Sequence, residues 1–562
     1  TLGSLYVGVE EGGTLAGNGT IYTSYLDSST VYNYGTIAPG DETECEGSVA
    51  CSVGTLTIEG DFVQTSSGAL DIELIYNGEK SVDLLNVTGT ADFSDTTGGT
   101  VNALPLGYVE EGRYTVLEAD MLELTSDPVL VVDDYVLFDV YLGYCPDGTV
   151  CDAGDVVNTM WLDVDRLTVT EAGGTPNQEE IYDTLMEEAG EGNEDAQALL
   201  DLLDQMLDPD DLYGALGSRT GEHYPNLLDL SMAGSKLYRS VVSGRMGNLH
   251  LTQMNTEDTR YFTNTVTEDG PVNSRLAAYE NRAAGSWSGW ARALTMNGEQ
   301  EKNSYVTGYD FDVNGMAAGF DRQVSENCSL GLGFGVASTD ADFDEYMQST
   351  EIDTYHAGLY STYSGDSLYI DVALLYASND YDTDRVIITL EELKKAKSST
   401  DGTEWGIYLG GGLNLVDTDS MYFAPTASIE FAQVDIDGFV EKGAGVDNLV
   451  VDDYDADSVV TTLGFRWGGK MMMSETARFE PELRVAWAHE FGDTDRSIKA
   501  QFEGTPSTAS LEGIEPEEDS ALVGVGANFF VNEQFTLFLD YDGEFRDDFD
   551  GHAFSGGFRY NF

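Results

Sequence analysis

The end of the chain alternates between two kinds of side chain. One face of the expected strand carries Phe554, Gly556, Phe558, Tyr560 and Phe562, and the other carries Ser555, Gly557, Arg559 and Asn561. A period of two places successive side chains on opposite sides of a β-strand. An apolar face with aromatic residues, opposite a polar face, is typical of a strand that has lipid on one side and a polar lumen on the other. We therefore predict that the chain ends in a membrane-spanning strand.

The same alternation recurs throughout the last half of the chain. In 479–491, for example, Glu480, Glu482 and Arg484 share one face, opposite a face of apolar residues. Reading the pattern back to Trp287 gives twelve candidate strands, at about 287–298, 311–323, 328–340, 350–364, 367–380, 403–416, 420–434, 456–469, 477–491, 518–531, 534–545 and 552–562.

The predicted connections between these strands alternate in length. Every second one is short, namely 324–327, 365–366, 417–419, 470–476 and 532–533, whereas others are long and rich in charge, such as 381–402, 435–455 and 492–517. An even number of strands with short turns at one end and long loops at the other is typical of an outer-membrane barrel. We predict a 12-stranded transmembrane antiparallel β-barrel over 287–562, with a large soluble β domain as the alternative.

Residues 1–172 predict strands with a different rhythm. Short apolar runs interrupted by glycine and asparagine, as in 54–62 and 68–72, recur at intervals of about seven to about twenty residues. Glycine and asparagine supply the positive-φ positions that the corners of a β coil need. We therefore predict a right-handed β-helix, in which each turn buries its inward apolar side chains against the next. Its surface is acidic, since Lys80, Arg113 and Arg166 are its only basic residues.

The region between the two β parts, 173–286, is expected to be a helical linker. Residues 177–207 are acidic and place apolar residues at three- and four-residue spacings, which predicts a helix that Pro209 ends. A second helix is predicted to start at Tyr224-Pro225 and to run to about Met254, because proline suits the first helical turn.

This second helix is slim and basic. Small residues recur along it, and its basic residues are Lys236, Arg239 and Arg245. A basic helix in so acidic a chain favours acidic surroundings, and four carboxylates are expected to point into the predicted lumen, namely Asp371, Glu480, Glu482 and Asp540. We therefore predict that the helix threads the barrel. The alternative is an amphipathic linker packed against the N-terminal strands.

Charge and composition narrow the partners. The net charge is −75, from 101 acidic and 26 basic residues. Nucleic acid is an unsuitable partner, because phosphate binding needs clusters of Lys and Arg. The charge instead fits a surface in high salt, or one with divalent cations as counter-ions. No apolar stretch is long enough for a transmembrane helix, and Thr1 does not begin a signal peptide, so we expect a chain that is processed or truncated at its start.

The five cysteines indicate a compartment. Cys45 and Cys51 lie close together in sequence, as do Cys145 and Cys151, in polar loops. We predict two short disulfide-closed loops formed in an oxidising space such as the periplasm. Metal ligation is the alternative, although no histidine lies near either pair. Cys328 is left over and is expected to be an inert thiol.

The sequence carries one motif that suggests catalysis. Residues 365–368, Gly-Asp-Ser-Leu, resemble the nucleophile block of certain esterases, but Ser367 falls in a turn between predicted strands and no Asp-x-x-His follows. The five histidines have no metal-ligand spacing, and the acidic run 452–457 lacks the glycine of a defined calcium loop. We therefore expect no enzyme, no cofactor and no metal site.

Several stretches resemble the monomeric autotransporters of Gram-negative bacteria, which use type V secretion. The pertactin-like end of a passenger β-helix is similar to residues 35–40, 60–64, 83–89 and 112–117. The pore helix of the family is similar to residues 221–246. Its translocator domain is similar to residues 290–292, 315–321 and Phe562. The resemblance implies three domains: a passenger end with an autochaperone-like role over 1–172, a linker and pore helix over 173–286, and an outer-membrane barrel over 287–562.

The resemblance also implies location and partners. The barrel is expected to lie in outer-membrane lipid, after insertion by the outer-membrane barrel assembly machinery. That machinery recognises the last strand, here through Phe558, Tyr560 and Phe562. Residues 1 to about 220 are expected on the extracellular surface.

Some members of the family cut the pore helix between two asparagines. Residues 224–262 contain no Asn–Asn pair, so we expect an attached passenger. The expected function is a protein that exports and anchors its own passenger as an adhesive or structural surface protein. An outer-membrane channel, or a surface esterase with an accessory N-terminal domain, is the alternative. The ligand of the passenger, on a surface or a host, stays open.

Overall fold

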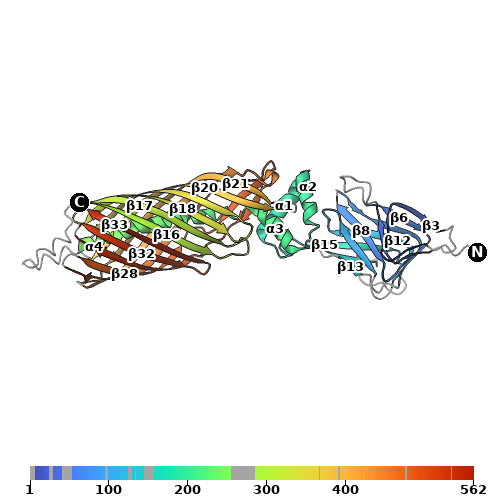
Figure 1. Cartoon of the computed structure of the whole chain (residues 1–562), viewed down its shortest axis with the longest axis horizontal. Helices are drawn as coiled ribbons and strands as arrows, with labels where there is room; N and C mark the ends of the chain where they lie inside the picture. The colour runs from blue at the N-terminus through green and yellow to red at the C-terminus, as the bar shows by residue number, and fades with distance from the viewer. Residues whose placement is uncertain are drawn as a thin grey trace, which may run out of the picture. The chain divides into compact units, whose positions relative to one another are not determined.

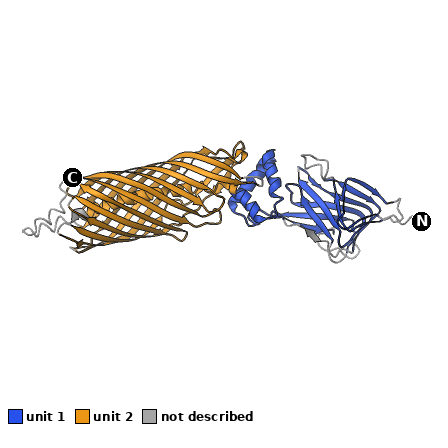
Figure 2. Ribbon diagram, in the orientation of Figure 1, with its two compact units in different colours: residues 1–217 blue, residues 218–562 orange. Residues whose placement is uncertain are grey.

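The chain forms two compact units, Thr1–Gly217 and Ser218–Phe562 (Figure 2). The predicted linker 173–286 is thus divided, with its first helices in the first unit and its long helix in the second. The computed structural model describes the chain except for residues 1–6, 24–29, 41–52, 77, 95–98, 125–129, 133–134, 145–156, 255–284, 366, 390–392, 419, 475–476 and 533.

The first unit contains two sheets. Their strands are β1 (Val7–Val9), β2 (Thr14–Gly17), β3 (Gly19–Tyr22), β4 (Thr30–Asn33), β5 (Thr36–Pro39), β6 (Thr55–Glu59), β7 (Asp61–Gln64), β8 (Ala69–Tyr76), β9 (Lys80–Val82), β10 (Leu84–Phe93), β11 (Thr100–Pro105), β12 (Gly112–Leu124), β13 (Leu130–Val132), β14 (Phe138–Gly143) and β15 (Thr159–Arg166). One sheet has the order β1-β4-β7-β10-β12-β15-β14, with β6 also beside β10 and β3 beside β6. The other has the order β13-β11-β8-β5-β2, with β9 beside β8.

Pairing in these sheets is mixed. The strands from β1 to β12 and from β2 to β13 pair in parallel, apart from β9, whereas β12, β15 and β14 pair antiparallel. Neighbouring strands place apolar residues side by side, so that Val31 lies beside Phe62 and Ile37 beside Leu70. All four side chains are fully buried. The N-terminal unit is therefore a set of mixed β-sheets around an apolar core.

Three helices follow these strands. The single helix predicted over 177–207 is in fact two, α1 (Pro176–Gly190) and α2 (Glu194–Leu203). They separate because Gly192 adopts a φ of 96° and the side chain of Asn193 caps the start of α2. Pro209 was expected only to end a helix, but it begins α3 (Pro209–Thr220), since proline fits the first helical position.

A buried ion pair joins these helices to the strands. The guanidinium of Arg166, at the end of β15, lies 2.6 Å from the carboxylate of Asp204, just after α2. The same carboxylate accepts a hydrogen bond from the backbone N–H of Val109, and Asp201 accepts one from that of Tyr108. Burial opposes the charge of Arg166, but the Asp204 carboxylate outweighs it and raises the pKa of Arg166 above its ordinary value. This pairing explains why α1 and α2 belong to the first unit.

The second unit is a closed barrel around one long helix, α4 (Leu227–Met254) (Figure 1). Its long strands are β16 (Trp287–Gln300), β17 (Tyr309–Ser325), β18 (Cys328–Phe343), β19 (Ser349–Ser364), β20 (Leu368–Ile388), β21 (Leu393–Leu413), β23 (Met421–Ile436), β26 (Tyr454–Gly469), β28 (Arg478–Glu490), β31 (Asp519–Phe530), β32 (Phe535–Phe545) and β33 (Phe549–Asn561). All neighbours are antiparallel, and the pairs β16–β33 and β21–β23 close the ring. The prediction of a 12-stranded antiparallel barrel is therefore confirmed.

One predicted loop is wrong. Residues 381–402 were expected to form a long connection, but β20 continues to Ile388 and β21 begins at Leu393. The strands continue because the inward face stays buried, as at Tyr381 and Arg385, while the outward face changes from apolar to acidic. The prediction ended these strands where their outward apolar residues end.

The other long loops contain a small sheet of their own. It joins β24 (Phe439–Val440), β25 (Leu449–Val451), β29 (Ser497–Phe502) and β30 (Ala509–Glu512), all antiparallel. The 3-10 helix Gly445–Asp447 lies between β24 and β25. Two short strands, β22 (Val416–Asp417) and β27 (Met471–Met472), pair at the ends of β23 and β28. The predicted loops 435–455 and 492–517 are therefore partly ordered structure.

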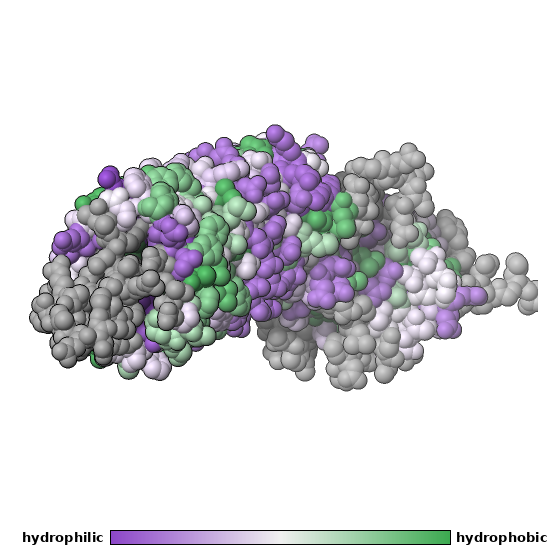
Figure 3. Space-filling model, turned by 60° about the vertical axis from the view of Figure 1, so that its left-hand side comes forward, coloured by the Kyte–Doolittle hydropathy of each residue, from purple (hydrophilic) through white to green (hydrophobic). Residues whose placement is uncertain are grey.

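The outer face of the barrel carries exposed apolar residues. On β18 they include Leu330, Phe334 and Val336, each between 45% and 55% exposed. Figure 3 shows hydrophobic residues gathered on one part of the barrel and hydrophilic residues dominating another. A strand of about nine to eleven residues spans a bilayer, so strands such as β20, with 21 residues, extend well beyond it. Among the described residues, no helix is both long and apolar enough to cross a membrane.

Candidate functional site: the barrel lumen

The helix α4 lies inside the barrel, as predicted from its slim and basic sequence (Figure 1). It packs mainly against β16–β20, with β19 as its most extensive neighbour. Tyr238 shows why glycines occur on that wall. A Cβ at Gly335 would lie 2.8 Å from the Tyr238 ring, and Tyr238 stacks on His356 with ring centroids 4.6 Å apart. The glycines of β18 therefore form the space that this ring fills.

A buried ion pair fixes α4 to the wall. Arg245 donates two hydrogen bonds to the carboxylate of Asp321 on β17, at 2.7 and 2.8 Å. Both side chains are at least 96% buried. The hydroxyl of Ser288 accepts from Arg245 and donates to Asp321, and Tyr360 also donates to Asp321. Because a bidentate Arg–carboxylate pair is directional, this cluster fixes the height and rotation of the helix.

The other two basic residues of α4 also pair with acids of the wall. Lys236 pairs with Glu544 on β32, and Arg239 pairs with Glu430 on β23. The sequence pattern predicted Lys236, Arg239 and Arg245 but none of their three partners. Glu544 continues the alternation of Asp540 and Asp542 along β32, so extending that pattern by one step would have found it. No such pattern marks Glu430 or Asp321, because the alternation along a strand shows that a side chain points inward but not at what height in the barrel it lies.

The four acids that were predicted to line the lumen have other partners. Asp371 is the one that contacts α4, at 2.8 Å from Nε2 of His250. Glu482 and Asp540 pair with arginines of the wall, Glu482 with Arg466 at 2.6 Å and with Arg484 at 2.9 Å, and Asp540 with Arg292 at 3.2 Å and with Arg484 at 3.1 Å. Glu480 pairs with Arg478 at 2.8 Å. The lumen therefore holds alternating charges that largely neutralise one another.

His250 joins a serine and an aspartate. Its Nδ1 lies 2.5 Å from the hydroxyl of Ser364, and its Nε2 bonds Asp371. All three side chains are buried, and the imidazole packs on Tyr369 with ring centroids 4.1 Å apart. Neighbouring Ser367, the residue of the esterase-like motif, lies in the turn between β19 and β20, where its carbonyl accepts from the N–H of Asn414. The His250 cluster is thus a second anchor of α4.

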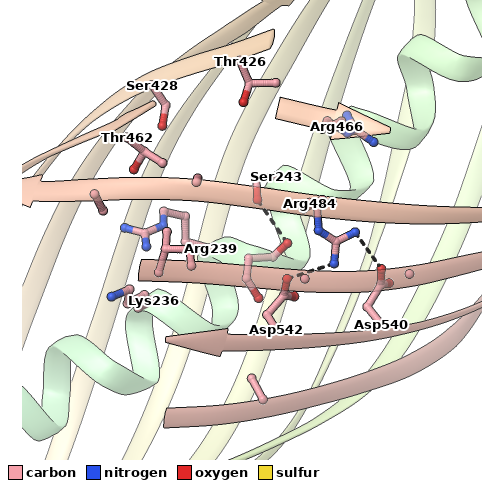
Figure 4. Close-up of a pocket in the computed structure, with 18 of the residues that line it drawn as sticks. Lys236, Arg239, Ser243, Thr426, Ser428, Thr462, Arg466, Arg484, Asp540 and Asp542 are labelled. Atoms are coloured by element: carbon pink, nitrogen blue, oxygen red, sulfur yellow. Dashed lines mark hydrogen bonds and ion pairs between the residues drawn. The ribbon is translucent and has the colours of Figure 1, made fainter. Parts of the chain in front are cut away.

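A cavity remains on the other side of the helix. Its volume is about 320 Å³, and its lining includes α4 together with β23, β26, β28, β31 and β32. Figure 4 shows Lys236 and Arg239 on α4, and Arg484 linked to Asp540 and Asp542 across the wall. The hydroxyls of Ser243, Thr426, Ser428 and Thr462 also line it. The lining combines apolar side chains, such as Phe465 and Leu522, with polar groups and charges of both signs.

The mouth, the barrel end at which α4 begins, is densely packed. Arg385 donates to Glu441 at 2.5 and 2.9 Å, and both side chains are fully buried. Glu441 also accepts a hydrogen bond from Tyr224, just before α4, at 2.7 Å. Arg219 pairs with Asp447 at 2.9 Å. The sequence pattern missed this network because Arg385, Glu441 and Asp447 lie in segments that were expected to be loops.

The last strand lies beside the first. Phe562 and Trp287 exchange backbone hydrogen bonds of 3.0 and 3.2 Å. The residues predicted to act in membrane insertion, Phe558, Tyr560 and Phe562, are 45%, 44% and 67% exposed on the outer face. Cys328 is a free thiol at the start of β18. The predicted disulfide cysteines, Cys45, Cys51, Cys145 and Cys151, lie outside the described residues.

Several curated proteins are similar to this chain at low sequence identity. An extracellular serine protease of Serratia marcescens is 21% identical over 319 residues, which are 56% of this chain and 30% of that protein. Outer membrane protein B of Rickettsia prowazekii (strain Madrid E) is 20% identical over 556 residues, which are 94% of this chain and 31% of that protein. The chain therefore spans about a third of the length of these curated relatives.

Solved structures are also similar to this chain, and a family description matches its barrel. The translocator domain of the autotransporter NalP from Neisseria meningitidis is 15% identical, with a TM-score of 0.41, and the similarity covers 50% of this chain and 90% of that one. The β domain of the Bordetella autotransporter Brka is 20% identical, with a TM-score of 0.38, over 50% of this chain and 100% of that one. Residues 289–542 match the family described as the Autotransporter beta-domain, and this match identifies the twelve-stranded barrel of the chain as an autotransporter translocator domain in the outer membrane.

Proposed function

We propose that this chain exports its own N-terminal unit across the outer membrane and holds it on the cell surface as an uncleaved adhesive or structural protein. The observation that supports this best is α4, which runs inside a translocator barrel and continues in the chain from the N-terminal unit. A chain that was exported through its own barrel is left in this arrangement. The mouth, where α4 begins, then faces the outside of the cell.

We propose that the N-terminal unit is the end of a passenger β-helix. Along one parallel ladder Val31, Phe62, Ala91 and Leu122 lie side by side, in steps of 31, 29 and 31 residues (62 − 31, 91 − 62 and 122 − 91). Near-constant steps between parallel neighbours are what successive turns of a coil produce. A right-handed coil is favoured, because parallel crossovers are almost always right-handed. The antiparallel strands β12, β15 and β14 then close its last turn.

The attachment of the passenger follows from the anchors of α4. The buried pair of Arg245 and Asp321 and the contact of His250 with Asp371 hold the helix at two heights. Residues 224–262 contain no Asn–Asn pair for self-cleavage. We therefore expect the passenger and the barrel to remain one polypeptide.

The last strand supports a proposal about insertion. Its aromatic residues face outward, where a partner can reach them before the barrel meets lipid. We expect the barrel assembly machinery to recognise this strand through them. The acidic surface outside the membrane is expected to attract divalent cations as counter-ions.

Protease accessibility on intact cells tests the proposal. The chain is expressed in a Gram-negative host behind a secretion signal, and whole cells are treated with proteinase K. In treated cells the N-terminal unit is expected to be lost, while a C-terminal antibody still detects the protected barrel. In untreated cells a single full-length band of 60.9 kDa is expected. Cells with a permeabilised outer membrane are the control. Protection of the N-terminal unit until permeabilisation would contradict the proposal.

A further inference from the structure

The helix does not fill the barrel evenly. One face of α4, with Val241, Val242 and Leu249, is at most 1% exposed. The opposite face, with Lys236, Ser240 and Ser243, is only half-buried and borders the cavity. These half-buried positions recur every three or four residues, which is the spacing of one helix face. The cavity of about 320 Å³ therefore lies alongside the helix, and polar and charged side chains form part of its lining.

The mouth differs in packing from the middle of the lumen. Every residue from 218 to 228 is buried, whereas residues 231–248 alternate between buried and half-buried. The small sheet of β24, β25, β29 and β30, called the loop sheet below, and the chain that follows β30 both contact this segment. Asn226 accepts from the N–H of Ile514 at 2.9 Å, and the ring of Tyr224 lies 4.7 Å from that of Phe439.

Charged groups hold the loops in place around this segment. Arg385, at the outer part of β20, bonds Glu441 and the backbone carbonyls of Ser218 and Asp447. Glu441 in turn accepts from Tyr224 and from the N–H of Leu449. One buried ion pair therefore connects the barrel wall, the loop sheet and the segment that enters the lumen.

We propose that these elements form a cap, and that the cap rather than α4 seals the barrel against small ions. The cap comprises residues 218–228, the strands β24, β25, β29 and β30, and the end of β20 that carries Arg385. When the cap is loosened, water and small ions pass along the cavity while α4 stays anchored by Arg245. This inference goes beyond export and needs only a barrel that lies in a membrane.

Single-channel recording in planar bilayers tests the cap. The full-length chain in its closed form is expected to pass little current. Glu441→Gln and Arg385→Gln each leave a buried polar group with a poorer partner and are expected to raise the conductance at least tenfold. Lys236→Gln, at the cavity, is the matched control and is expected to leave the closed state unchanged. An unchanged conductance in both cap variants, with the barrel folded, overturns the proposal.

A reversible lock separates loosening of the cap from misfolding. A Cβ at Gly513 would lie 2.7 Å from Cβ of Pro225, so cysteines at both positions come within reach of a disulfide after a small shift. In the Glu441→Gln background, Pro225→Cys with Gly513→Cys is expected to conduct weakly when oxidised and strongly when reduced. Glu441→Gln without the added cysteines controls for the native thiols. A conductance that ignores oxidation in the locked protein contradicts a sealing cap.

Thiol labelling tests the route. In the loosened background, Ser243→Cys faces the cavity and a charged methanethiosulfonate reagent is expected to block most of the current. Val242→Cys faces the wall on the same helix and is the matched control. Equal block of the two variants, or block of neither, means that ions take another path and refutes the cavity as the route.

Discussion

Replacement of Arg245 by methionine tests whether a buried ion pair holds α4 in the barrel. Methionine keeps much of the length of the side chain but removes its charge and its donors. Asp321 is then left buried without its guanidinium partner, although the hydroxyls of Ser288 and Tyr360 still donate hydrogen bonds to it. Loss of one partner of a buried pair costs about 3–5 kcal/mol. Because these hydroxyls still stabilise the carboxylate, the expected loss is about 3 kcal/mol, at the lower end of that range.

Urea unfolding of the detergent-solubilised chain, followed by tryptophan fluorescence, measures this loss. With an m-value of about 3 kcal/mol/M, a loss of about 3 kcal/mol lowers the midpoint by about 1 M. The second observable is trypsin sensitivity of α4, which is expected to rise because the helix loses its register. The double variant Arg245→Met with Asp321→Asn removes both charges. Its loss of unfolding free energy is expected to be smaller than the sum of the two single losses, by a coupling energy of at least about 2 kcal/mol.

The control is Lys236→Met, which removes a partly exposed ion pair instead of a fully buried one. The side chain of Lys236 is 38% exposed to the cavity, so its pair with Glu544 is expected to contribute less than about 1 kcal/mol. The reasoning is refuted by strictly additive losses for Arg245 and Asp321, or by equal losses for Arg245→Met and Lys236→Met. Either result would mean that burial does not decide the strength of these pairs.

Three further predictions concern parts outside the lumen. Asp204→Ala leaves Arg166 buried without its carboxylate and is expected to cost the N-terminal unit about 3–5 kcal/mol in pulse proteolysis. Burial raises the pKa of Asp83 from 3.8 to about 7, so the contribution of its protonated form to stability is fully present below pH 3.8 and is lost as the pH rises through 7. In urea titrations between pH 4 and 8, Asp83→Asn should remove up to about 4 kcal/mol of this pH dependence of the unfolding free energy. Asp340 lies opposite Glu351 on exposed strands, so Asp340→Asn should raise the heat-modification temperature at low salt, and a difference that persists at 1 M salt would count against repulsion.

The alternation of apolar and polar side chains along each strand, called parity here, predicted the barrel because lipid requires one face of each strand to be apolar. Each membrane-spanning strand must present apolar side chains to lipid, so Leu368, Ile370 and Val372 fall on one face where the strand lies in the membrane. Beyond the membrane this requirement ends. The strand β20 continues with Asp380 and Asp382 outward, and the sequence then resembles a charged loop. The missed strand length therefore lies where lipid no longer selects the residues.

Parity could not predict which charges meet. It gives the face of a side chain but not its height, which depends on the tilt of the strands and on the position of α4. Asp540 was correctly placed inward, yet its partner is Arg484 from a strand two positions away in the barrel. Arg245 was correctly placed on the pore helix, yet its partner is on the wall against which α4 leans. Such pairs depend on a register that no single segment contains.

The distribution of charge explains how so acidic a chain can form a specific lumen. The chain has 26 basic residues for 101 acidic ones, so most acids lack a cation. Inside the barrel, however, Arg292, Arg466 and Arg484 each pair with an acid of the wall, and the basic residues of α4 do the same. Burial makes such pairing necessary there, because an isolated charge out of water is costly. On the outer face of the barrel, like charges such as Asp312 on β17 and Asp340 on β18 lie opposite each other in solvent, where salt screens their repulsion. At least six of the 26 basic residues therefore form ion pairs in the lumen, where they fix the position of the helix and neutralise buried acids of the wall.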